Sequence, residues 1–535
     1  MKNIYILFLL ISSFSFAQIV QVKDIWTGVG NSSSPANLFD FSGTLLFRAN
    51  DGVNGVELWK SDGTDAGTVL VKNINAGTTV SGTSNPANFT SFSGQVLFTA
   101  SNGTDVNATE LWKTDGTNAG TVLVKDINAT AANASGNPQN FTIINPTTML
   151  FSASDGIGGN ELWKTDGSTA GTVNVIDYPG TTNSITWIEN LNGTGILGQI
   201  VSNTGREIYK SDGTGANSGL VLDITTGTTG GVGTTFFKSG NVIYFGGNSG
   251  TTGTELWKTD GTTAGTVLVK DINAGTTASS PGRFAAIGST VYFRATGANG
   301  AELWKTDGTE IGTVEVADIF SGTGSSNPDQ VTSVNGAIYF FAADSATDAN
   351  DLYKYDGTTL TKLADFNAKA NTLSSNFVLL GTTVYFAADS KDADEFRELW
   401  QTDGTPVGTI SVSSLHSPVV NPTGVSNITA VGGKLFFTAA STDGTELFKY
   451  EPVLSVSNAD FAERVQVYPN PTNGKMYLNL KSTDTVYYQI LDLLGKTVSE
   501  GTVNNNEIDF EAEKGVYLLK LENSEFISRQ KIIKK

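Results

Sequence analysis

The sequence predicts an all-β chain: a β-propeller of about nine four-stranded blades, followed by a small C-terminal β-sandwich. Three observations predict it. One motif recurs nine times at intervals of 46 to 53 residues. The segments between its copies are short apolar runs bounded by Gly, Asn and Asp, which is typical of strands and turns. After residue 17, no stretch carries an apolar period of 3.6 residues that is long enough for a helix.

The composition excludes several classes of function. The 535 residues include no cysteine, so disulfides, thiolate nucleophiles and cysteine-ligated metals are excluded. His416 is the one histidine. A chain with a single histidine cannot form a multi-histidine metal site. We interpret His416 as a loop residue rather than a general base. The net charge of −19 argues against a nucleic-acid partner, because phosphate binding needs clustered Lys and Arg.

Residues 1–17 are predicted to be a secretory signal peptide. A positive start, Met1-Lys2-Asn3, precedes an apolar run that ends in the small-x-small site Ser15-Phe16-Ala17. A membrane anchor is the alternative, but the run is shorter than the roughly 18 residues that a span requires. No later segment predicts a transmembrane helix, so we expect an exported chain that is cleaved after Ala17.

The repeats fill residues 18–455. Their motif reads Glu-Leu-Trp-Lys-Thr-Asp-Gly-Thr. The third position is always aromatic, at Trp59, Trp112, Trp163, Tyr209, Trp257, Trp304, Tyr353, Trp400 and Phe448.

The second repeat shows the predicted order of elements. Ser93-Gly94 and Asp115-Gly116 are turn signals that separate runs rich in Val, Phe, Thr and Trp. The runs predict four antiparallel strands, at Asn88–Phe92, Gln95–Ala100, Glu110–Thr114 and Thr121–Asp126. Four strands in about 48 residues is the size of one propeller blade.

The N-terminal strand is predicted to complete the last blade. Ile19–Ile25 copies the fourth strand of a repeat, whereas the ninth repeat has only three strands, ending at Glu446–Tyr450. Pairing these segments would close the array and remove exposed sheet edges. A linear solenoid is the alternative, and it would be expected to carry polar caps. Propellers typically have about four to eight blades, so a ring of eight blades with one irregular repeat is an alternative to nine.

The motif is interpreted as structural. Side chains alternate along a strand, so Trp112 shares a face with Glu110 and is expected to fill the wedge between blades. Asp115 and Gly116 are expected to form a turn. The alternative makes the nine aromatic residues a multivalent sugar-stacking array.

Acidic loops give a weak calcium prediction. The loop before the motif varies in length, and such loops usually carry binding surfaces. Oxygen-rich loops can bind calcium, but none matches the twelve-residue calcium-loop pattern, and solvated loops are the simpler interpretation. The candidate ligands lie in two of these loops, at Asp344, Asp348, Asp351, Asp389, Asp392 and Asp394, and a third acidic loop spans Asp51–Gly55.

Residues 456–535 differ from the repeats. Their 10 Lys+Arg nearly balance 11 Asp+Glu. About seven short runs predict a β-sandwich. These runs are Val465–Tyr468, Lys475–Leu480, Val486–Asp492, Thr497–Val503, Glu507–Phe510, Gly515–Leu521 and Phe526–Ile533.

This tail resembles the type A C-terminal sorting domain of the bacterial type IX secretion system. The residues that carry the resemblance are Tyr468, Pro469, Asn470, Pro471, Gly474 and Gly515. The resemblance implies Sec export to the periplasm of a Gram-negative bacterium, followed by outer-membrane translocation through the type IX machinery. It also implies that the tail is removed and the product is released or attached to the cell surface. The repeats are similar to the ELWxxDGT repeats of secreted bacterial proteins.

Two classes of function follow as expectations. The first is a non-enzymatic binding or adhesion platform for an extracellular glycan or protein. The second is an extracellular carbohydrate-active enzyme, a hydrolase or lyase that uses carboxylates at the propeller mouth. A structural role in a surface layer is a third possibility.

Overall fold

The computed structural model describes residues 19–76, 82–101, 108–130, 134–178, 183–201, 205–227, 230–347, 351–366, 377–389, 397–412, 423–452, 465–480, 486–492, 497–503, 506–522 and 527–535. These residues divide into two compact units, one formed by Ile19–Glu451 and one that contains Pro452–Lys535. The predicted signal peptide lies outside the described residues.

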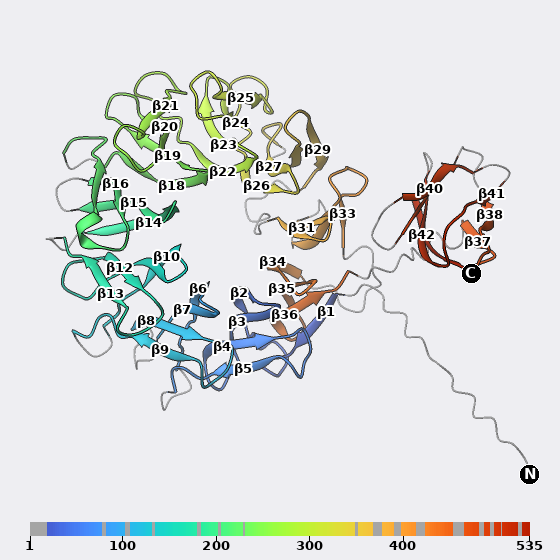
Figure 1. Cartoon of the computed structure of the whole chain (residues 1–535), viewed down its shortest axis with the longest axis horizontal. Coiled ribbons are helices and arrows are strands. Elements are labelled where there is room, and N and C mark those ends of the chain that lie inside the picture. Colours follow the sequence, from blue (N-terminus) through green and yellow to red (C-terminus); the bar gives the residue numbers. More distant parts are fainter. Residues whose placement is uncertain are drawn as a thin grey trace, which may run out of the picture. The chain divides into compact units, whose positions relative to one another are not determined.

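The first unit consists of nine four-stranded antiparallel sheets among the residues that the structure describes. We number the sheets one to nine by the chain order of their first strands. Figure 1 shows them succeeding one another around a common centre, with the first strands innermost. The first strands are β2 (Ala36–Phe41), β6 (Ala87–Phe92), β10 (Gln139–Asn145), β14 (Ser184–Leu191), β18 (Val232–Ser239), β22 (Gly282–Ile287), β26 (Asp329–Val334), β30 (Val378–Leu380) and β34 (Thr423–Val431).

The second and third strands form the middle of each sheet, and the third carries the motif. The second strands are β3 (Thr44–Asn50), β7 (Gln95–Ser101), β11 (Thr148–Ala153), β15 (Thr194–Val201), β19 (Val242–Asn248), β23 (Thr290–Gly297), β27 (Ala337–Ala342), β31 (Thr383–Ala388) and β35 (Lys434–Ser441). The third strands are β4 (Val56–Ser61), β8 (Thr109–Thr114), β12 (Glu161–Thr165), β16 (Gly205–Ser211), β20 (Thr254–Thr259), β24 (Gly300–Thr306), β28 (Asp351–Tyr355), β32 (Glu398–Thr402) and β36 (Gly444–Tyr450).

The fourth strands are short. In sheets one to eight they are β5 (Val69–Lys72), β9 (Val122–Lys125), β13 (Val173–Ile176), β17 (Gly219–Leu222), β21 (Val267–Lys270), β25 (Val314–Ala317), β29 (Leu360–Ala364) and β33 (Ile410–Ser411). A single 3-10 turn, Gly215–Asn217, precedes β17. In the second repeat the fourth strand begins one residue later than predicted, because Thr121 belongs to the turn: its hydroxyl lies 2.7 Å from that of Thr114.

The ninth sheet takes its fourth strand from the other end of the unit. β1 (Ile19–Lys23) pairs antiparallel with β36, with Ile19 opposite Tyr450 and Gln21 opposite Phe448. This is the pairing that the sequence predicts. The ninth sheet also packs on the first, since Leu447 and Trp59 lie in one buried cluster. Closure of the nine sheets into a ring stays a prediction, which these contacts support.

The core lies between neighbouring sheets. The motif leucine of one sheet and the motif aromatic residue of the next belong to the same buried cluster. Leu58 thus packs with Trp112, Leu111 with Trp163, and Leu162 with Tyr209. Alternation along the strand causes this, because consecutive side chains point to opposite faces. One strand therefore supplies apolar contacts to both of its neighbours.

The second unit is a two-sheet sandwich. One sheet contains β37 (Val465–Tyr468), β38 (Lys475–Leu480) and β41 (Glu507–Asp509). The other contains β40 (Thr497–Thr502), β39 (Tyr487–Leu491), β42 (Gly515–Glu522) and β43 (Ile527–Lys534). The two sheets share one buried core, which includes Met476, Ile490, Ile508 and Leu519. The seven strands match the predicted runs to within two residues at each end.

Replacing a motif tryptophan should destabilise the first unit. Trp112 is 6 % exposed and packs between sheets one and two, so Trp112→Ala should lower the free energy of unfolding by about 3–5 kcal/mol. Ile311 is 91 % exposed, and Ile311→Ala should change it by less than about 0.5 kcal/mol. Chemical denaturation followed by tryptophan fluorescence measures both. Equal effects of the two substitutions would contradict the packing role of Trp112.

Candidate functional site

The motif glutamate fastens the connection between successive sheets. Glu110 accepts hydrogen bonds from the backbone N–H of Ile127 at 2.8 Å and of Gly136 at 2.6 Å. Both donors lie in the segment that leaves the second sheet for the third. The same pattern recurs at Glu57, Glu207, Glu255, Glu302 and Glu446.

Burial changes the acidity of these glutamates. It raises the pKa of Glu57, Glu110 and Glu207 to about 7, while the hydrogen bonds that each carboxylate accepts oppose the rise. In the third sheet burial raises the pKa of Glu161 to about 6, and Asn174 donates to it at 2.8 Å. Burial also raises the pKa of Glu255, Glu302 and Glu446 above the ordinary value for glutamate.

The motif lysine reaches the next sheet. Lys113 donates its ammonium to the carbonyl oxygen of Gly167 at 3.0 Å, and that glycine belongs to the motif turn of the third sheet. Lys60, Lys258 and Lys354 make the same bond to Gly116, Gly308 and Gly404. The lysine thus joins neighbouring sheets through backbone carbonyls.

The remaining polar residues of the motif form its turn. Asp115 accepts from the backbone N–H and the hydroxyl of Thr117, at 2.8 and 2.7 Å, and these bonds lower the pKa of Asp115. Gly116 has φ +83°, a conformation that favours glycine, and it donates to the Thr114 hydroxyl. Gly120 lies so close to Asp115 that an added Cβ would fall 2.1 Å from its carboxyl carbon.

The motif aromatic residues lie in the core. Seven of the nine are buried, and Trp257 and Trp400 are partly buried. A ring that packs between two sheets offers little face to a sugar. The described geometry therefore supports the structural interpretation of the motif over the sugar-stacking array.

Two of the predicted calcium ligands contact a lysine instead. The Lys362 ammonium lies 2.8 Å from Asp344, 2.7 Å from Asp351 and 2.6 Å from Asp365. A cation at this point would have to displace the ammonium. Asp389 is fully buried after β31. Asp348, Asp392 and Asp394 lie outside the described residues, so calcium binding at these positions stays a prediction. His416 also lies outside the described residues.

The third acidic loop is held by its own side chains. Asp51 accepts from the backbone N–H groups of Val53 and Asn54 at 2.9 and 2.7 Å, and the Asn54 amide donates to its second oxygen. This is the pattern of an Asx turn, which needs no bound cation.

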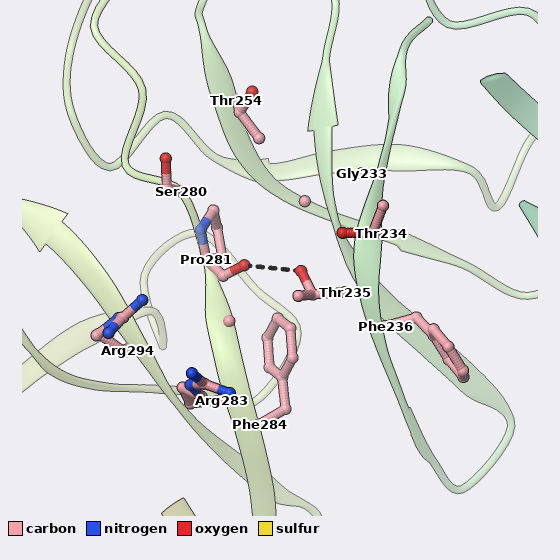
Figure 2. A pocket seen from close by; sticks show the side chains of 12 residues that line it. Gly233, Thr234, Thr235, Phe236, Thr254, Ser280, Pro281, Arg283, Phe284 and Arg294 are labelled. Carbon is pink, nitrogen blue, oxygen red and sulfur yellow. Dashed lines mark hydrogen bonds between the residues drawn. The ribbon is translucent and has the colours of Figure 1, made fainter. Parts of the chain in front are cut away.

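A cavity of about 570 Å³ lies between the inner strands of the fifth and sixth sheets. β18 and β22 form its sides, and Figure 2 shows Arg283, Arg294 and Phe284 gathered on the β22 side. Thr235 donates to the carbonyl oxygen of Pro281 at 3.1 Å across it. Among the acidic residues of this unit, two arginines at one cavity mark it as a candidate binding site.

Irregular pairing opens this cavity. In the fifth sheet Val232 lies opposite Gly247 and Phe236 opposite Phe245, so three residues of β18 face one residue of β19. Gly233 and Gly246 line the hollow and contribute no side chain to it. The repeat pattern did not predict this site. Its signal was the replacement of bulkier residues by glycine in the fifth repeat, followed by arginines in the sixth.

The sorting-motif residues join the two ends of the second unit. The Asn470 amide donates to the carbonyl oxygen of Lys531 at 2.7 Å, and its oxygen accepts from the N–H of Ile533 at 2.9 Å. Gly474 has φ +117°, and an added Cβ would lie 2.7 Å from a backbone oxygen. Tyr468 ends β37 and Gly515 begins β42, while the prolines follow Tyr468 and Asn470, at Pro469 and Pro471.

Comparison with known proteins assigns the second unit. Residues 466–535 match the family described as the secretion system C-terminal sorting domain. This domain supports export by the type IX system and indicates a secreted or cell-surface protein. In the part of the chain that the structure describes, no helix has the length and apolar character of a membrane span.

The other similarities are more distant. An endo-acting ulvan lyase from Formosa agariphila is 32% identical over 97 residues, which are 17% of this chain and 19% of that protein. The chain thus matches about a fifth of the length of that relative. A prolyl endopeptidase structure is 11% identical and covers 71% of this chain and 55% of its own, with a TM-score of 0.40. The extracellular domain of a one-component system from B. thetaiotaomicron is 10% identical, covering 95% and 76%, with a TM-score of 0.33.

Acidification should stabilise the repeat unit. The pKa of Glu57, Glu110 and Glu207 is about 7 in the folded protein against an ordinary value of 4.5, so the folded state binds more protons between these pH values. The resulting stability is fully present below about pH 4.5 and is lost as the pH rises through 7. The thermal unfolding midpoint, followed by circular dichroism, should therefore be higher at pH 5 than at pH 8.

A triple variant separates this effect from general charge repulsion. Glu57→Gln, Glu110→Gln and Glu207→Gln together should reduce the difference in midpoint between pH 5 and pH 8. Asp115→Asn is the matched control. Hydrogen bonds lower the pKa of Asp115, so this change should shift the midpoint equally at both pH values. An unaltered pH difference in the triple variant would exclude the buried glutamates as its source.

Proposed function

We propose that the nine-sheet unit is an extracellular binding platform, exported by Sec and then by the type IX system, that binds a glycan or protein without chemical conversion. One observation carries this proposal. Polar side chains of the motif are engaged in contacts within and between sheets, as Glu110 and Lys113 show. Features that depart from the repeat, above all the cavity at Arg283 and Arg294, are left to bind a ligand.

The domain organisation fits this role. A signal peptide at residues 1–17, a repeat unit at 18–455 and a sorting domain at 456–535 would take the chain through two membranes in sequence. Ring closure through β1 and β36 would give the platform a fixed set of inner strands. The sorting domain would contact the secretion machinery, after which the product would be released or attached to the cell surface.

A carbohydrate-active enzyme is the second candidate, because a stretch of 97 residues is similar to an endo-acting ulvan lyase. Such an enzyme would need carboxylates from several sheets at one pocket. The cavity between β18 and β22 is lined instead by glycines, hydroxyl groups, phenylalanines and two arginines. This lining favours binding over hydrolysis by paired carboxylates.

Binding to immobilised glycans tests the platform. The full chain should bind at least one class of extracellular glycan on an array, and the bound glycan should be recovered with unchanged chain length. Failure to bind any member of a broad panel of glycans and outer-surface proteins would contradict the proposal. Shortening of a bound polysaccharide would establish the enzymatic candidate in its place.

Export should depend on the second unit. A chain without residues 456–535 should fold and remain in the periplasm, because the type IX signal is gone. Immunoblots of periplasmic and culture fractions measure this. Asn470→Ala is a finer change, since it removes both bonds to β43, and it should reduce secretion while Tyr487→Ala, at an exposed position in the same unit, should not. Normal secretion of the truncated chain would refute the assignment of the tail.

A further inference from the structure

We propose that the cavity between β18 and β22 binds the anionic group of an acidic saccharide, either a carboxylate or a sulfate, and that Arg294 and Arg283 recognise it. This inference rests on the proposed binding function and names the ligand class of one site.

Arg294 has no charged partner among the residues that the structure describes. Its side chain is partly buried, and it makes no ion pair or side-chain hydrogen bond with another described residue. Arg283 forms an ion pair with Asp329 through Nε at 2.8 Å, and its side chain remains 53 % exposed. A guanidinium group presents five N–H donors in a plane, which suits the paired oxygens of a carboxylate or sulfate. An anion between the two arginines would supply the missing counter-charge.

Arg283 departs from the repeat in residue type. It has φ +57°, in the left-handed region, at the position that asparagine holds in the first three sheets. There the asparagine amide bridges to a backbone carbonyl of the next sheet, as Asn37 does to Pro86 and Asn88 does to Pro138. Arg283 makes its bridge to the next sheet as an ion pair instead, because its partner Asp329 begins β26. The longer side chain also brings a positive charge to the lining of the cavity.

Pairing within the sixth sheet brings the two arginines together. Arg294 lies opposite Gly282, the residue before Arg283, so both guanidinium groups arise at the same level of the sheet. Figure 2 shows them on one side of the cavity, with Phe284 beside Arg283. Phe236 and Phe284 line the cavity together with exposed hydroxyl-bearing residues. A cavity with apolar side chains and a few polar groups in its lining is typical of sites that bind a small ligand.

The rest of the chain limits the length of the ligand. A protein with a net charge of −19 repels a long polyanion, whereas a local pair of arginines attracts a single anionic group at short range. The site therefore fits a terminal or isolated acidic sugar on a largely neutral chain. We expect binding to weaken as salt rises, because the attraction depends on exposed charges.

Titration of simple acidic sugars into the full chain tests the site. The probes are glucuronic acid and glucose 6-sulfate, with glucose as the neutral control and sodium sulfate as the bare anion, followed by ligand-observed NMR. Both acidic sugars, or one of them, should bind more tightly than glucose and than the bare anion. Arg294→Gln should weaken that binding at least tenfold, since it removes a charge-assisted contact. Arg283→Gln should weaken it to a smaller extent, because Asp329 already neutralises part of its charge.

Arg48→Gln is the matched control. Arg48 lies opposite Ala36 in the first sheet, the same register position that Arg294 has in the sixth, and it does not line the cavity. This variant should bind as the unaltered chain does, and all variants should keep its circular dichroism spectrum.

The outcomes separate the site from the wider function. Binding of neutral glycans that Arg294→Gln leaves intact, with no preference for acidic sugars, would overturn this inference and leave the platform standing. Equal loss in Arg48→Gln and Arg294→Gln would overturn it as well, because the effect would then be one of net charge. Preference for one of the two acidic sugars decides between carboxylate and sulfate.

Discussion

The nine-sheet unit depends on one interaction, the binding of backbone N–H groups by a buried carboxylate. Each connection between sheets leaves the end of a fourth strand and must turn toward the first strand of the next sheet, with backbone groups that no strand partner satisfies. In six of the nine described sheets the motif glutamate accepts backbone hydrogen bonds from that segment, as Glu110 does from Ile127 and Gly136. An unsatisfied buried N–H would cost about 1–3 kcal/mol, so the carboxylate fixes the path of the chain from one sheet to the next.

The other motif residues follow from the position of this glutamate. Strand alternation places the leucine toward the next sheet and the aromatic side chain toward the preceding one, and the lysine continues on the leucine side to reach the next turn. One strand of five to seven residues therefore determines spacing, packing and connection. This explains why the third position changes only among aromatic residues, since Tyr209 packs between two sheets as Trp112 does, and Phe448 is buried too.

Repetition is what made the fold predictable from the sequence. Nine copies of one pattern reveal strands, turns and the unpaired segment Ile19–Ile25. The predicted strand ends in the second repeat differ from the structure by one residue, as at Thr121, whose side chain joins a turn. The cavity could not be predicted in this way, because it depends on two extra residues in the pairing of β18 with β19. A change of register leaves no periodic signal, and neither Gly233 nor Arg294 belongs to a known motif. The predicted calcium ligand Asp351 illustrates the same limit, since its partner Lys362 comes from a neighbouring strand.

The union of β1 with β36 has a consequence for the order in which the chain can fold. The contact between Ile25 and Glu446 spans 421 positions, so the first strand of this unit must wait for its last. Contacts of such long range form slowly. Eight sheets can assemble from local hairpins as they appear, but the ninth remains incomplete until synthesis is nearly finished. A chain that crosses the inner membrane in extended form would therefore make this final pairing only on the far side.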